Sequence, residues 1–173
     1  IEEFVRAFVW EDGAMTELPS LGGNSSVARA INASGIVVGD SGVPVTQYGR
    51  ALLWKDGTAT ELGTLGGNQS VALDVNDAGQ IVGWSWNASS TPRAFLWEGD
   101  LESDPPIGAM IDLGALSGGR AFARAINELG QVVDVLARQG VGQHHPRRDL
   151  ASQPRHRSTH LTPRRLDDRH HLA

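Results

Sequence analysis

The stretch of this 173-residue sequence nearest to a known metal-binding motif is DVNDAGQIV, at residues 74–82. In a calcium loop the side chains at positions one, three and five supply oxygen ligands, and a later glutamate binds the ion with both oxygens. Asp74 and Asn76 fit this pattern, but Ala78 stands at the fifth position and the glutamate is missing. We therefore predict an Asx turn closed by Gly79, and we expect no metal ion and no other cofactor.

The segment LGGN, at residues 21–24 and again at 65–68, is rich enough in glycine to suggest a phosphate-binding loop. A phosphate loop lies between a strand and a helix, and it usually carries a lysine that reaches the phosphates. No lysine follows either copy, and the residues on both sides have the pattern of strands. We therefore predict that LGGN forms a tight connection between hairpins.

The sequence shows no pairing of a nucleophile with a histidine that could act as its base. All six histidines lie within residues 138–173, where eight arginines stand against three acidic residues, whereas residues 1–137 carry seventeen acidic and seven basic residues. We predict that residues 138–173 are a disordered basic tail, and the abrupt loss of pattern also fits out-of-frame translation. The alternatives are an arm that binds an anionic surface and a metal site at the pairs His144–His145 and His170–His171.

The sequence before this tail repeats itself three times. The motif Arg-Ala-(Phe/Leu)-(Val/Leu)-Trp occurs at residues 6–10, 50–54 and 93–97, with spacings of 44 and 43 residues. Each copy leads to Thr-Glu-Leu or Ile-Asp-Leu, then to a glycine-rich loop, then to an Asn-x-x-Gly segment. We predict the end of a preceding repeat at 1–5, followed by repeats at 6–49, 50–92 and 93–137. The third repeat carries an insertion at about 98–109.

Each repeat contains four short apolar runs separated by turn signals, which predicts two β-hairpins. Asp-Gly at 12–13 and 56–57 and the Asn-x-x-Gly segments are typical hairpin turns. We predict that the two hairpins of one repeat form a four-stranded antiparallel sheet, and that stacked copies cover one another. The repeat length favours a partial arc of three blades of a β-propeller in an all-β fold, with a β-trefoil and a β-solenoid as alternatives. We expect Trp10, Trp54 and Trp97 to be equivalent and buried between sheets.

The long repeated motif resembles the HAF-type repeat family of extracellular bacterial proteins, named for a His-Ala-Phe triplet. The resemblance covers residues 6 to about 134, with Arg6, Arg50 and Arg93 at the histidine position and Leu52 in place of Phe in the second copy. It implies tandem sheet repeats and an extracellular or cell-surface location. It implies no activity and supplies no catalytic residues.

The function that we expect is non-enzymatic binding or scaffolding outside the cell, with a glycan or a protein as ligand. Residues that recur in the loops between blades have a structural explanation, so the unrepeated residues there carry more functional weight, and we predict the binding residues Gln47, Tyr48, Trp86 and Asn87. Further repeats of a parent chain would be partners, whereas we expect no nucleic acid and no membrane span; no secretion signal is visible at residues 1–10. The alternative is a fragment of a propeller-type polysaccharide lyase or hydrolase whose catalytic residues lie in other repeats.

Overall fold

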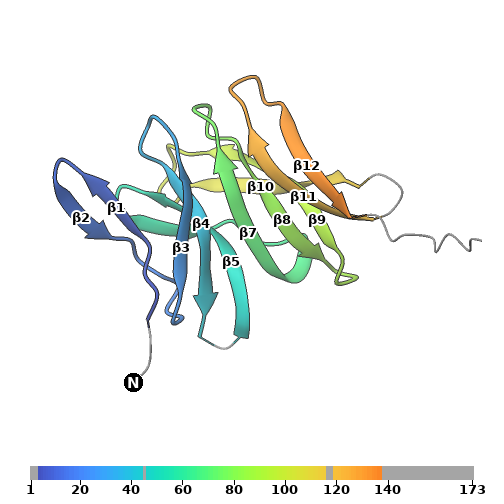
Figure 1. Cartoon of the computed structure of the whole chain (residues 1–173), viewed down its shortest axis with the longest axis horizontal. Helices are drawn as coiled ribbons and strands as arrows, with labels where there is room; N and C mark the ends of the chain where they lie inside the picture. The colour runs from blue at the N-terminus through green and yellow to red at the C-terminus, as the bar shows by residue number, and fades with distance from the viewer. Residues whose placement is uncertain (1–3, 45, 116–118, 138–173) are drawn as a thin grey trace, which may run out of the picture. The chain divides into compact units, whose positions relative to one another are not determined.

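The computed structural model describes residues 4–44, 46–115 and 119–137, which form strands and turns and contain no helix (Figure 1). The predicted tail at 138–173 lies outside the described residues, and so do residues 1–3. The strands are β1 (Phe8–Glu11), β2 (Ala14–Glu17), β3 (Ser26–Ile31), β4 (Val37–Val43), β5 (Thr46–Lys55), β6 (Thr58–Glu61), β7 (Gly66–Val75), β8 (Ile81–Asn87), β9 (Pro92–Asp100), β10 (Ile107–Gly114), β11 (Arg120–Ile126) and β12 (Val132–Ala137).

The strands form two four-stranded sheets, β3-β4-β5-β6 and β7-β8-β9-β10, and two separate hairpins, β1-β2 and β11-β12. All neighbouring strands are antiparallel. The predicted four-stranded antiparallel sheets are therefore confirmed, but their composition differs from the prediction. Each sheet joins the second hairpin of one repeat to the first hairpin of the next, because β4 pairs with β5 and β8 pairs with β9. Within the described residues, the sheets do not close into a barrel or a propeller ring.

The hairpin turns lie where the sequence predicts them. Asp12-Gly13 and Asp56-Gly57 have positive φ angles at both residues, of 50° and 84° in the first turn and 50° and 76° in the second. Two successive positive φ angles define the turn whose twist matches that of a hairpin, and Asp and Gly tolerate them best. Local turn chemistry therefore accounts for these two hairpin turns without any contact between hairpins.

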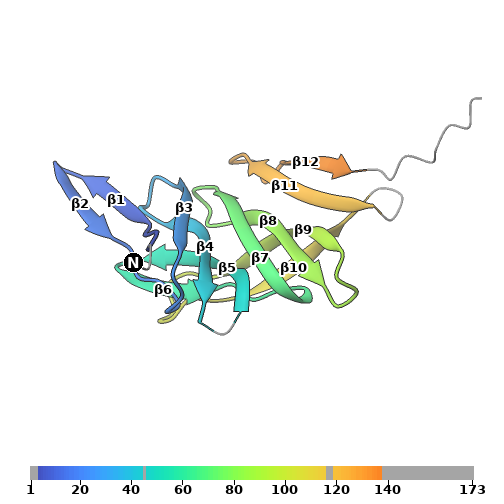
Figure 2. The ribbon, with the colours of Figure 1, turned by 60° about the horizontal axis from the view of Figure 1, so that its bottom comes forward.

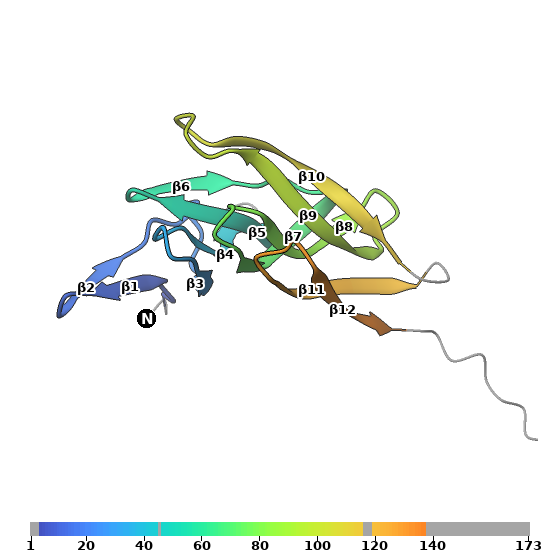
Figure 3. The ribbon, with the colours of Figure 1, turned by 90° about the horizontal axis from the view of Figure 1, so that it is seen from above.

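The apolar core consists of layers between neighbouring sheets. Figures 2 and 3 show the two four-stranded sheets next to each other, and β7 packs against both β4 and β5. Leu53 and Ala51 of the first sheet share this layer with Phe95 and Trp97 of the second. The predicted stacking of sheets is thus confirmed, since each sheet covers the apolar face of its neighbour.

The three repeated tryptophans do not share one environment. Trp54 and Trp97 are 1% and 2% exposed, as expected, and Trp54 also donates a hydrogen bond from Nε1 to the carbonyl of Pro19 at 2.7 Å. Trp10 is 64% exposed, so the prediction that all three are buried is wrong for Trp10. Among the described strands, β1 pairs only with β2, and no described sheet covers the face of β1 that carries Trp10.

Two buried serines join the hairpins of one repeat, although these hairpins belong to different sheets. Ser26 Oγ accepts the main-chain N–H of Ala7, and Ser70 Oγ accepts that of Ala51, both at 3.0 Å. Ser70 also donates to the carbonyl of Gly63 at 2.7 Å. A buried N–H without a hydrogen-bond partner destabilises the folded state. These serine hydroxyls therefore stabilise the point at which the chain passes from one sheet to the next.

Candidate functional site

Two of the four predicted binding residues lie in contact. The rings of Tyr48 on β5 and Trp86 on β8 have centroids 5.7 Å apart and an angle of 51° between their planes. They come from different repeats and different sheets, and Tyr48 is exposed while Trp86 is half-buried. Gln47 also lies on β5, but its side chain is outside the described part of the structure. The fold thus brings together two aromatic residues that are far apart in the sequence and do not recur between repeats.

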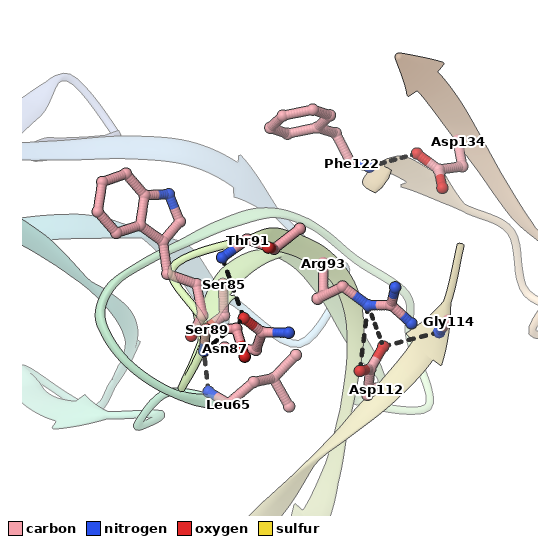
Figure 4. Close-up of polar contacts among 11 residues, drawn as sticks. Leu65, Ser85, Asn87, Ser89, Thr91, Arg93, Asp112, Gly114, Phe122 and Asp134 are labelled. Carbon is pink, nitrogen blue, oxygen red and sulfur yellow. Dashed lines mark hydrogen bonds and ion pairs between the residues drawn. The ribbon is translucent and has the colours of Figure 1, made fainter. Parts of the chain in front are cut away.

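Asn87, the fourth predicted residue, closes a loop. Its Oδ1 accepts the N–H groups of Ser89 and Thr91, each at 3.0 Å (Figure 4). This is the Asx-turn geometry that the sequence predicts for the repeated asparagines, now formed at a position outside the repeat pattern. The carboxamide oxygen of Asn87 therefore has a structural role in shaping the loop beside Trp86.

The second LGGN segment, at residues 65–68, packs against the main chain at Trp86. A Cβ atom on Gly67 would lie 2.5 Å from the carbonyl oxygen of Trp86, so only glycine allows this approach. Thr64 Oγ1 donates to the carbonyl of Gly67 at 2.9 Å. Residues 66–68 already belong to the strand β7, so the predicted tight connection is wrong for most of this copy, whereas the first copy, at residues 21–24, lies between β2 and β3 as predicted.

The residues of the calcium-like stretch are engaged in hydrogen bonds within the protein. Asp74 Oδ2 accepts the N–H of Ile126 at 2.9 Å, and Asn76 Oδ1 accepts the N–H of Gln80 at 2.9 Å. Residues 4–44, 46–115 and 119–137 hold no group of three or more His, Asp or Glu side chains that could bind a metal ion. The turn predicted at residues 76–79 is present, closed by a main-chain hydrogen bond of 3.0 Å from the N–H of Gly79 to the carbonyl of Asn76.

The arginines that begin each repeat form ion pairs with the acidic residue of the Thr-Glu-Leu or Ile-Asp-Leu run. The nitrogen–oxygen distances are 3.3, 3.6 and 3.2 Å in the pairs Arg6–Glu17, Arg50–Glu61 and Arg93–Asp112, the last of which Figure 4 shows. Each pair joins the two chain segments of one hairpin. The recurrence of these charges therefore has a structural explanation and does not indicate a site.

A cavity of about 260 Å³ lies where three repeats meet, and the sequence did not reveal it. Its lining comes from β3, β7, β8 and β11 and consists of Arg29, Val71, Leu73, Trp84, Phe122 and Arg124. The rings of Trp84 and Phe122 meet edge to face, with centroids 5.8 Å apart and planes at 68°. The cavity thus combines an aromatic wall with two guanidinium groups.

Three equivalent β-bulges direct residues toward this cavity. The register shifts between Ala28 and Ala30 on β3, between Ala72 and Asp74 on β7, and between Ala123 and Ala125 on β11. The extra residue in each bulge is a lining residue, namely Arg29, Leu73 and Arg124. Bulges change the direction of a side chain and occur often next to functional sites. The sequence signal was the variation at one repeat position, which is Arg, Leu and Arg in the three copies.

The two arginines of the cavity differ in their charge balance. Arg29 Nε donates to Asp40 Oδ1 at 2.7 Å, which neutralises its guanidinium. Arg124 is exposed, and no ion pair or hydrogen bond joins its side chain to another residue in the described ranges. At the position equivalent to Asp40, the second repeat has Trp84. The cavity therefore offers one uncompensated positive charge beside an aromatic wall.

The two aromatic pairs are linked through β8. Trp84 and Trp86 are two residues apart on this strand, and no register shift separates them in the pairing with β9. Alternate residues of a strand lie on the same face, so Trp84 and Trp86 share one face of β8. Tyr48, Trp86, Trp84 and Phe122 therefore form what we call the aromatic row.

No protein-family model, no curated protein and no solved structure matches the chain. In the described part of the protein, no helix is long and apolar enough to cross a membrane.

Proposed function

We propose that the chain is a non-enzymatic, extracellular binding module that holds an acidic oligosaccharide along the aromatic row. Its sheets would be blades in an arc of a β-propeller, as the repeat spacings of 44 and 43 residues suggest. The observation that carries the proposal is the cavity in which Trp84 and Phe122 meet beside Arg124.

The chemistry of this cavity suits a ligand with flat apolar faces and carboxylate groups. Half-buried aromatic rings such as Trp84 and Phe122 present apolar surface to a ligand at little cost in side-chain entropy. A guanidinium binds a carboxylate through two parallel hydrogen bonds, and Arg124 has no competing acidic partner within the described residues. A sugar acid carries both features in one residue, and a chain of sugar acids would extend from Arg124 toward Tyr48.

The charge of the repeats argues against nucleic acid as the ligand. Residues 1–137 carry seventeen acidic and seven basic side chains, a net charge of 7 − 17 = −10. Nucleic-acid binding depends on many basic side chains that neutralise phosphates. A single uncompensated arginine at the cavity fits a short ligand with few charges better than a polyanion.

The test is calorimetric titration of the protein with oligogalacturonate and with an uncharged galactan fragment of similar length. Trp84→Ala should abolish measurable binding, and Arg124→Gln should weaken oligogalacturonate binding about tenfold, or ~1.4 kcal/mol, while binding to the galactan stays unchanged. Arg120→Gln is the matched control, since Arg120 lies on the same strand but does not line the cavity. Equal loss of affinity in the Arg120 and Arg124 variants would contradict the proposal.

The same probe tests the alternative of a polysaccharide lyase or hydrolase. Cleavage would release new chain ends from oligogalacturonate over time, whereas a binding module leaves the ligand intact. New chain ends formed by the purified chain would replace the binding function with an enzymatic one.

A further inference from the structure

Several apolar residues at the two ends of the repeat array are exposed, although their equivalents in other repeats are buried. Ile31 is 56% exposed, whereas Val75 and Ile126, at the same repeat position, are 6% and 9% exposed. Val133 is 61% exposed, whereas Val38 and Val82 are fully buried. Trp10, Phe8 and Leu113 show the same contrast with their own equivalents.

At the beginning of the array, the exposed residues lie on or beside the hairpin β1-β2, which forms only half of a four-stranded sheet. In both complete sheets the first hairpin of a repeat pairs with a strand from the preceding repeat, β4 beside β5 and β8 beside β9. No described strand lies beside β1 in this way. Instead, a cavity of about 290 Å³ lies between β1 and β3, lined by Phe8, Trp10, Ala30 and Ile31 among others.

At the other end, the half sheet β11-β12 lacks the opposite partner. Its strand β12 corresponds to β4 and β8, but no described strand pairs with its free edge. Leu113 of β10 is 43% exposed there, while Leu18 and Leu62 at the equivalent position are each 6% exposed. The two ends are therefore complementary. Among the described strands, the hairpin β1-β2 lacks a neighbouring hairpin equivalent to β3-β4, and the hairpin β11-β12 lacks one equivalent to β5-β6.

We propose that the hairpin β11-β12 of one copy pairs with the hairpin β1-β2 of a second copy of this chain. The result is a sheet of order β11-β12-β1-β2, which repeats the order of the two complete sheets. The register follows that of β8 with β9, where Ile81 faces Trp97 and Val82 faces Leu96. By equivalence, Val132 of one copy faces Trp10 of the other, and Val133 faces Val9.

The contact continues an interface that the chain already uses twice. Besides the main-chain ladder, β8 and β9 are joined by a hydrogen bond of 2.5 Å from Gln80 Nε2 to Glu98 Oε1. The equivalent residues are Gln131 and Glu11, so the same bond is available between the copies. The edges of β12 and β1, with which no other described strand pairs at this side, supply main-chain donors and acceptors for the ladder.

One residue departs from the repeat at this contact. Asp134 stands where the other copies have Gly39 and Gly83, and its carboxylate accepts the N–H of Phe122. By the register above, Asp134 faces Phe8 of the second copy, where glycine would leave more room. Replacing Asp134 with glycine should therefore strengthen the association.

The association is head to tail, because the two contacting surfaces are different. Such heterologous contacts produce a closed ring when the rotation closes and a filament when it does not. Sedimentation equilibrium of the full chain over a wide concentration range should give a mass that rises to at least twice the monomer mass of 18.5 kDa. A mass that stays at 18.5 kDa at every concentration would overturn the proposal.

Two single variants test which surfaces meet. Trp10→Glu blocks one surface and Val133→Lys blocks the other, and both side chains are exposed, so the fold should tolerate the changes. Each variant alone should be monomeric, but a mixture of the two should form a dimer and nothing larger, since each variant keeps one intact surface. Association that survives both substitutions, or a mixture that stays monomeric, would contradict head-to-tail pairing.

The matched control is Leu129→Lys. Leu129 is also exposed, but its equivalents Ser34 and Ala78 are exposed too, so this position lies outside the proposed contact. The control variant should associate as the unchanged protein does, and Asp134→Gly should lower the concentration at which association begins. Loss of association in the control would mean that any added charge disperses the copies, which would remove the support for this specific pairing.

Discussion

Asn76 donates a hydrogen bond from its Nδ2 to the main-chain oxygen of Asn127 at 3.1 Å, although 51 positions separate the two residues. Asn32 makes the same bond to the main-chain oxygen of Asn76 at 3.0 Å. Each of these asparagines also shapes its own turn, because its Oδ1 accepts main-chain N–H groups two to four residues later in the chain. The asparagine that closes the turn within one repeat therefore also connects that repeat to the next.

We predict that Asn76→Ala lowers the free energy of unfolding by about 2–4 kcal/mol, because three part-buried groups, two on Gln80 and the main-chain oxygen of Asn127, lose this partner. Asn76 is 1% exposed, and its side chain also bonds Gln80. Urea denaturation followed by tryptophan fluorescence measures this change. The control is Asn127→Ala, which should cost only about 0.5–1.5 kcal/mol, since Asn127 is exposed and its side chain, among the described residues, bonds only within its own turn. Equal costs would show that the bond between repeats contributes nothing.

The repeated tryptophans make a second matched pair. Trp54→Ala should cost about 3–5 kcal/mol, as expected for removal of a large buried side chain. Trp10→Ala should stay within about 0.5 kcal/mol, because surface changes rarely exceed this value. Thermal unfolding at low protein concentration keeps the comparison free of association. A large cost at Trp10 under these conditions would mean that the side chain is covered in solution.

Substitution of Gly67 tests the close packing beside Trp86. Gly67→Ala would place a methyl group 2.5 Å from the Trp86 carbonyl oxygen, so we expect a loss of about 1–3 kcal/mol from overpacking. Gly49→Ala is the control, since its nearest neighbour is a side-chain oxygen of Asp40 at 3.2 Å and not a main-chain atom. Chemical denaturation of both variants should separate them, and an unaffected Gly67 variant would show that the loop can move away.

The hydroxyl of Ser70 provides a fourth test. Ser70→Ala leaves the N–H of Ala51 and the carbonyl of Gly63 without their partner, so the expected loss of stability is about 1–3 kcal/mol. Ser20→Ala, which removes only an exposed bond of 3.3 Å to the N–H of Gly22, should change stability by less than about 0.5 kcal/mol. Hydrogen exchange of the Ala51 amide gives a local readout, and unchanged protection there would contradict the assigned role of Ser70.

The sequence by itself was sufficient to predict the strands and the turns of their hairpins. Asp12-Gly13, Asp56-Gly57 and the turn closed by Gly79 lie where the pattern predicts them, because a turn depends on the φ preferences of a few adjacent residues. The same local logic led correctly from DVNDAG to a turn and from the first LGGN segment to a connection, whereas residues 66–68 of the second LGGN segment lie in β7. Repetition of these signals also predicted stacked sheets.

Only the tertiary structure decided which hairpins share a sheet and which residues meet. The period of the repeat is the same whether β4 pairs with β5 or a sheet ends between them, so the sequence pattern contains no information on this choice. The different exposures of Trp10 and Trp54 follow from that choice and not from the motif that both share. Likewise, Trp84, Phe122 and Arg124 come together because bulges and sheet packing act across distant segments, and such contacts leave no periodic signal in the chain.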